Sequence, residues 1–264
     1  MKERIITAIC LLAVVLPLIY LGGYWLMGLG LVAVLMATYE MIAMHDKLQR
    51  VPVWIKGIAF MGVLFVVFIP GFRDPIFYNA QFGSMVFATL LLVINRIRIK
   101  KNQGDISLYP LIIFYIGFSF RALLQIRNHS LTLFIFLIAA VILTDSAAYF
   151  IGKFFGKHQL APKISPKKTI EGAIGGLLVG FIFALVFGLM QGLFAQTWVL
   201  IVLAIGVPLL SQMGDLVASI FKRHYDIKDY GNIFPGHGGV MDRVDSQLLA
   251  AFLIYMIIQF GGLG

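Results

Sequence analysis

Residues 170–190, IEGAIGGLLVGFIFALVFGLM, decide the fold of this chain, because they form a long apolar run with a single ionisable residue, Glu171. A helix needs roughly 17 to 25 apolar residues to cross the hydrocarbon core of a bilayer. Comparable runs recur along the chain and predict about nine membrane-spanning helices, centred on 5–21, 24–44, 53–70, 76–95, 108–125, 131–151, 170–190, 197–220 and 245–261.

The composition supports a protein that is solvated by lipid. Of the 264 residues, 60% are hydrophobic and 12% are charged, and the mean hydropathy is +0.94, whereas soluble domains carry about 25% charged residues. The sequence therefore predicts an all-α, polytopic transmembrane bundle, organised as a single integral-membrane domain over residues 1–264.

The positive charges predict the orientation of this bundle, because Lys and Arg beside membrane spans are retained in the cytoplasm. If the N-terminus is cytoplasmic, all of the 21 Lys and Arg residues except Arg73, Arg121 and Arg127 fall on the cytoplasmic side. We therefore expect a cytoplasmic N-terminus, with the net charge of +9 gathered on that face. Attraction to anionic lipid headgroups is one explanation of positive charge in the cytoplasmic loops, and binding of a polyanionic substrate is the other.

Carboxylates in or beside the spans are candidate functional groups, since an ionisable side chain is costly within a membrane. Six are predicted to gather toward the cytoplasmic face: Glu40, Asp145, Glu171, Asp215, Asp242 and Asp245. Asp242 and Asp245 share a helix face at a spacing of three residues. With Asp215 they can hold Mg²⁺, which binds one or two carboxylates together with water and phosphate oxygens. Capping of the last helix is the competing explanation for this pair.

Candidate functional residues are most concentrated in residues 219–246, SIFKRHYDIKDYGNIFPGHGGVMDRVDS. Its glycines allow backbone N–H groups to approach an anion closely, and a helix begins after Gly239, with its positive end toward the loop. These features suit a triphosphate. The cationic side chains of the segment are Lys222, Arg223, Lys228, His237 and Arg243.

A second basic segment, residues 144–172, is a weaker signal. Lys167 and Lys168 follow Ser165-Pro166, and without a partner this pattern is typical of a solvated loop. The glycines that follow at every fourth position, 172, 176 and 180, predict close helix packing and no ligand site.

The segment 219–245 resembles the signature of the phosphatidate cytidylyltransferase family, also called CDP-diacylglycerol synthases. The residues that match are Ser219, Lys222, Arg223, Lys228, Asp229, Gly231, Phe234, Pro235, His237, Gly238, Gly239, Asp242, Arg243 and Asp245. The stretch 144–172 is similar to a second block of the same family, so the resemblance covers essentially the whole chain.

The resemblance implies an activity: CMP is transferred from CTP to phosphatidate, giving CDP-diacylglycerol and pyrophosphate for phospholipid synthesis. It also implies magnesium dependence, a homodimer, and an active site that faces the cytoplasm. The short loops and compact chain favour a bacterial cell membrane. The partners are then CTP, phosphatidate and membrane lipid, and no nucleic acid is expected.

Site residues are assigned from these residue patterns together with the resemblance. The catalytic residues are expected to be Lys228, Asp229, His237 and Arg243. Substrate binding is expected from Lys167, Lys168, Ser219, Lys222, Arg223, Gly238 and Gly239, and the metal ligands from Asp215, Asp242 and Asp245.

Two rival functions remain open on the sequence. A CTP-dependent polyprenol or phytol kinase would use an alcohol as the acceptor, and the full signature argues against it. An ion-coupled transporter would place its polar groups near the midplane of the membrane, whereas here they gather toward one face.

Overall fold

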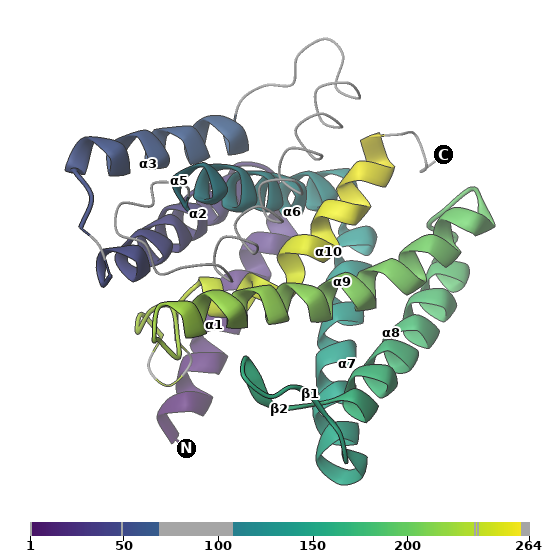
Figure 1. Ribbon diagram of the computed structural model, residues 1–264. Coiled ribbons are helices and arrows are strands. Elements are labelled where there is room, and N and C mark those ends of the chain that lie inside the picture. Colours follow the sequence, from purple (N-terminus) through teal and green to yellow (C-terminus); the bar gives the residue numbers. More distant parts are fainter. Residues whose placement is uncertain (1, 49, 69–107, 235, 237, 260–264) are drawn as a thin grey trace. The chain divides into compact units, whose positions relative to one another are not determined.

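The computed structural model of the chain describes residues 2–48, 50–68, 108–234, 236 and 238–259 (Figure 1). The candidate span 76–95 therefore lies outside the described residues. The chain forms two compact units, each built from two stretches of sequence. Unit 1 comprises Met1–Leu124 and His224–Val244, and unit 2 comprises Gln125–Arg223 and Asp245–Gly264. A single domain over residues 1–264 stays a prediction.

Unit 1 is helical in its N-terminal stretch. Its elements are α1 (Lys2–Leu21), α2 (Gly23–Asp46), α3 (Val53–Phe68), the short α5 (Leu108–Leu111), the π-helical turn η1 (Ile112–Ile116) and most of α6 (Gly117–His129). The run predicted as one span from residue 108 is thus a helix that contains a π-turn, a local widening that often marks a functional region.

Helix α3 packs tightly against η1 and α6 within unit 1. A Cβ atom added to Gly62 would lie 2.9 Å from Ile113, and one added to Gly117 would lie 2.8 Å from Val66. Arg121 of α6 is buried, with 6% of its surface exposed. Its Nη1 donates a hydrogen bond of 3.0 Å to the carbonyl of Val66, in the last turn of α3, where carbonyls lack helical partners.

Unit 2 contains the long apolar helices that follow. Its elements are α7 (Leu131–Phe155), β1 (Gln159–Ala161), β2 (Ser165–Thr169), α8 (Ile170–Gln191), α9 (Thr197–His224) and α10 (Met241–Gln259), of which α9 ends and α10 begins in unit 1. Ser130 caps α7 by accepting the amide of Leu133 at 3.3 Å. Gly192 ends α8 in the left-handed conformation that favours glycine, with φ of 57°.

The glycine row of α8 confirms the predicted close helix packing (Figure 1). A Cβ atom on Gly172 would lie 2.6 Å from the carbonyl oxygen of Ala148, and one on Gly176 would lie 2.7 Å from that of Thr144, both in α7. A methyl group does not fit at either position, so glycine allows the backbones of α7 and α8 to approach.

A two-stranded antiparallel hairpin between α7 and α8 is a feature that the all-α prediction missed. Strands β1 and β2 pair Gln159 with Thr169 and Ala161 with Ser165. The turn is closed by the Ile164 amide, which donates to the Ala161 carbonyl at 3.1 Å, and it contains a proline, which favours turns. Apart from this hairpin and an isolated bridge between Phe234 and Gly238, the described regular structure is helical, which confirms the predicted class.

In the described parts of the chain, five helices are long and apolar enough to cross a membrane. They are Gly23–Asp46, Leu108–His129, Leu131–Phe155, Ile170–Gln191 and Thr197–His224. Two shorter apolar helices are Ile9–Leu21 and Val53–Phe68. The total of nine spans and the cytoplasmic N-terminus stay predictions.

Candidate active site

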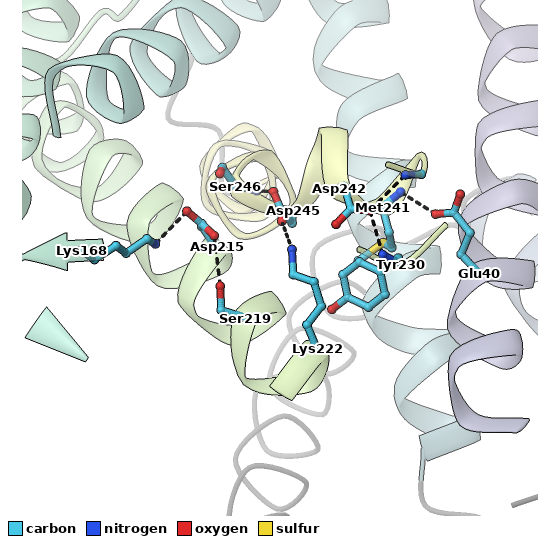
Figure 2. Close-up of polar contacts among 11 residues, drawn as sticks. Glu40, Lys168, Asp215, Ser219, Lys222, Tyr230, Met241, Asp242, Asp245 and Ser246 are labelled. Atoms are coloured by element: carbon cyan, nitrogen blue, oxygen red, sulfur yellow. Dashed lines mark hydrogen bonds and ion pairs between the residues drawn. The ribbon is translucent and has the colours of Figure 1, made fainter. Parts of the chain in front are cut away.

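The first polar cluster lies in unit 2, where β2 and α9 bring a lysine and an aspartate together (Figure 2). The Lys168 Nζ lies 2.7 Å from Asp215 Oδ2, and the two side chains are 26% and 32% exposed. Ser219, one turn further along α9, donates to Asp215 Oδ1 at 3.4 Å. The structure thus gives Lys168 a defined partner, and its role in substrate binding stays a prediction.

Asp145 of α7 belongs to the same cluster. Ser211 of α9 donates to its Oδ1 at 3.4 Å. Asp145 also makes a side-chain hydrogen bond with Ser246 and lies within electrostatic range of Asp215 and Lys168. The sequence signalled Asp145 only as a carboxylate in an apolar run, and its partners are too distant along the chain for a local pattern to identify them.

The second pair of unit 2 joins α9 to α10. The Lys222 Nζ lies 3.5 Å from Asp245 Oδ2, and these side chains are only 13% and 11% exposed (Figure 2). Asp245 Oδ1 accepts the amide of Ser246 at 2.9 Å. The helices touch at Gly214, where a Cβ atom would lie 2.6 Å from the carbonyl oxygen of Asp245. The residues predicted as metal ligands at 215 and 245 therefore lie on helices in direct contact.

Asp242 is held within unit 1. Its Oδ2 accepts the amide of Tyr230 at 2.8 Å (Figure 2). The same oxygen accepts the amide of Gly239 at 3.0 Å. Gly238 has φ of 81°, and a Cβ atom there would lie 2.7 Å from Asp242 Oδ2. The carboxylate of Asp242 thus binds amides of the loop before α10, whereas an N-cap side chain would accept amides inside the first turn of the helix.

These contacts also give the glycines a steric role that the sequence did not predict. The amide of Gly239 donates to Asp242, and a side chain at Gly238 would collide with that carboxylate. Binding of phosphate by Gly238 and Gly239 stays a prediction.

Several predicted site residues lie at the surface. Lys167, Arg223, Lys228, Asp229 and Arg243 are exposed. The Nε of Arg223 donates to the carbonyl of Ile164, in the turn of the hairpin, at 3.1 Å. His237 lies outside the described residues.

Glu40 is a buried carboxylate for which the sequence predicted no role. It lies in α2 and is 1% exposed. Its Oε1 accepts the amide of Val240 and its Oε2 accepts that of Met241, each at 2.8 Å, at the start of α10. The pattern of a carboxylate inside an apolar run flagged Glu40, but only the structure gives its partners.

The polar side chains of unit 2 offer the oxygen ligands that a hard divalent cation prefers. Within the described residues, no group of three or more His, Cys, Asp or Glu side chains is arranged to hold a metal ion. Magnesium, however, takes one or two carboxylates and completes its shell with water and phosphate oxygens. Asp145, Asp215 and Asp245, with Ser211, Ser219 and Ser246, offer oxygen donors alone, which is the donor type that magnesium prefers, and magnesium binding stays a prediction.

Comparison with known proteins identifies the family. Residues 2–261 match the model of the Cytidylyltransferase family. The phosphatidate cytidylyltransferase of Staphylococcus aureus (strain COL) is 35% identical over 262 residues, which cover 98% of this chain and 99% of that protein. The phosphatidate cytidylyltransferase of Staphylococcus haemolyticus (strain JCSC1435) is 34% identical over 261 residues, with the same coverage of both chains. The match over nearly the whole length shows that the chain belongs to the cytidylyltransferase family.

Proposed function

We propose that this chain is a phosphatidate cytidylyltransferase, which transfers CMP from CTP to phosphatidate and so forms CDP-diacylglycerol and pyrophosphate. The observation that carries the proposal is the pair of lysine–carboxylate contacts in unit 2, Lys168 with Asp215 and Lys222 with Asp245. Phosphoryl and nucleotidyl transfer depend mainly on positioning and on stabilisation of negative charge. The names of the relatives in Staphylococcus support the same activity.

In this reaction a phosphate oxygen of phosphatidate attacks the α-phosphorus of CTP. A new P–O bond forms, the bond between the α-phosphorus and the bridging oxygen breaks, and pyrophosphate leaves with the electron pair. A phosphate monoester is already anionic near neutral pH, so no general base is required. The cationic side chains Lys168, Lys222, Lys228 and Arg243 would then bind the phosphates of both substrates.

Magnesium belongs to the proposal as a cofactor. Asp215, Asp242 and Asp245 are the proposed ligands, and the contacts of Asp145 with Ser211 and Ser246 add it to the candidates. A bound Mg²⁺ would supply charge neutralisation at the phosphate oxygens. Lys168 of β2 and Lys222 of α9 would neutralise further negative charge on the phosphates.

The apolar helices support a membrane location for the substrate. Acyl chains of phosphatidate would stay in the bilayer while the headgroup reaches the polar cluster. A cytoplasm-facing site in a bacterial cell membrane, nine spans and a homodimer belong to this proposal and rest on the charge distribution and on the family resemblance.

The test uses purified protein, phosphatidate vesicles and CTP labelled in the cytosine ring. We expect label in the lipid phase and an equal amount of released pyrophosphate. A lipid kinase would release CDP and leave the cytosine label in water, and a transporter would form neither product. Replacing phosphatidate by diacylglycerol is the matched control, because that acceptor lacks the attacking phosphate. Labelled CDP without labelled lipid would refute the proposal.

A further inference from the structure

The carboxylate of Glu40 is the most deeply buried acidic group in the described residues, and the proposed reaction does not use it. Transfer of a carboxylate out of water is unfavourable unless hydrogen bonds or charges compensate it. Both oxygens are compensated here, by the amides of Val240 and Met241 at 2.8 Å each. The contact joins residues that are 200 and 201 positions apart in the sequence.

The partners of Glu40 are the amide of Val240, directly before α10, and that of Met241, the first residue of the helix. The N-terminal amides of a helix lack helical acceptors and carry partial positive charge, so a carboxylate is well matched to them. Glu40 thus acts as a cap that is supplied by another helix, α2. Removal of the carboxylate would leave two buried N–H groups without acceptors.

The loop before α10 leaves space for this carboxylate. A Cβ atom on Gly231 would lie 2.7 Å from Glu40 Oε1, and one on Gly239 would overlap both oxygens of the same carboxylate. The amide of Gly239 in turn donates to Asp242. Glu40 and Asp242 therefore hold consecutive amides of one short segment, Gly239 to Met241.

We propose that Glu40 is a positioning residue that fixes the start of α10 and thereby the placement of Asp242 and the glycine segment before it. The proposal rests on the function proposed above, because the placed residues are the candidate metal and phosphate ligands. Glu40 itself has both oxygens engaged by the backbone, so its proposed action is through α10.

The first test compares Glu40→Gln and Glu40→Asp with the parent chain in the CTP assay. Gln has the size of Glu, but its NH₂ group would face one of the two backbone N–H groups and could not accept its hydrogen bond. Asp keeps the negative charge on a side chain that is one methylene shorter. We expect the KM for CTP to rise at least tenfold in Glu40→Gln and by less in Glu40→Asp. Asp46→Asn is the control from the same helix, because Asp46 pairs with Lys56 instead of α10, and its KM should stay unchanged.

Comparing the effects of Glu40→Gln on KM and on kcat distinguishes a loss of positioning from a loss of folded protein. A purely structural defect reduces the amount of active protein and leaves the KM of the remaining molecules at the parent value. A lowered maximal rate with unchanged KM in Glu40→Gln would therefore overturn the proposal. So would parent-like kinetics.

A double variant tests the contact itself. Gly239→Ala alone should be severely impaired, because its methyl group overlaps the Glu40 carboxylate. In a Glu40→Ala background that space is vacated, so adding Gly239→Ala should cause less than a twofold further change. Equal effects of Gly239→Ala in both backgrounds would refute the contact.

Hydrogen exchange provides a readout that does not need activity. In Glu40→Ala, the amides of Val240 and Met241 should exchange at least tenfold faster than in the parent, while those in the middle of α7 stay protected. If the parent forms no CDP-lipid, the proposed function fails, and unchanged exchange at these two amides would separately refute the anchoring by Glu40.

Discussion

Gly214 provides the sharpest structural test of the candidate site, because it sets the distance between α9 and α10 beside Asp215 and Asp245. A Cβ atom at Gly214 would lie 2.6 Å from the carbonyl oxygen of Asp245. Carbon–oxygen contacts of this kind usually measure about 3.3 to 3.6 Å. Gly214→Ala should therefore push the two helices apart by up to about 1 Å at the site, because the obstructing atom belongs to the backbone.

The expected effect on stability is modest. Overpacking typically costs about 1 to 3 kcal/mol, and replacing a helical glycine by alanine recovers about 1 kcal/mol. We therefore expect the free energy of unfolding to fall by roughly 0 to 2 kcal/mol. The expected effect on turnover is much larger, since a misplacement of about 1 Å in an active site can reduce the rate about 100-fold.

Gly206→Ala is the matched control in the same pair of helices. Its Cβ would meet the Cδ2 atom of Leu253, the end of a flexible side chain of α10 that can rotate away. This variant should keep its turnover and gain up to about 1 kcal/mol from helix propensity.

The assay measures conversion of CTP into labelled lipid, together with equilibrium unfolding in mixed micelles, for both variants and the parent. Parent-like turnover in Gly214→Ala would show that the spacing of Asp215 and Asp245 does not control the reaction. That result would remove the pair from the site.

The remaining predictions concern the metal, the phosphates and the topology. Asp245→Asn should lower turnover by orders of magnitude and raise the magnesium requirement, whereas Asp226→Asn, at an exposed turn, should stay active; a normal magnesium titration for Asp245→Asn would reject its role as a ligand. Lys228→Ala should raise the KM for CTP at least tenfold, since a charge-assisted contact contributes about 1.5 to 3 kcal/mol, and Lys47→Ala should change it little; equal, small effects would favour a surface that merely attracts lipid headgroups. A reporter fused to the C-terminus should be active only outside the cytoplasm, and activity only inside would contradict the predicted orientation.

The long apolar helices could be predicted because their signal is local. Helices α7 and α8 were expected at 131–151 and 170–190 and occupy Leu131–Phe155 and Ile170–Gln191. The length of an apolar run and the caps beside it suffice for such elements. The glycine row of α8 was likewise readable, because small residues at every fourth position indicate close packing.

The hairpin was missed because its strands are only 3 and 5 residues long, and the start of α10 was missed because the carboxylate that binds its first amide comes from a distant part of the sequence. The hairpin leads into α8, where the carboxylate of Glu171 accepts the amides of Lys157 and His158 at 3.1 and 3.2 Å. Helix α10 was expected near residue 245 and begins at Met241, where Glu40 supplies the cap. The signature named Asp242 and Asp245, but a motif does not show that one binds loop amides and the other a lysine.

The anchoring of α10 by Glu40 has a consequence for how the protein is made. The ribosome incorporates Glu40 some 200 residues before Val240, so α2 is synthesised long before its partner exists. During that interval the carboxylate must be hydrated at the end of the helix or neutralised by a proton. We therefore expect chains arrested before α10 to expose an unsatisfied acidic group in α2, so that unit 1 is completed only when the start of α10 has been made.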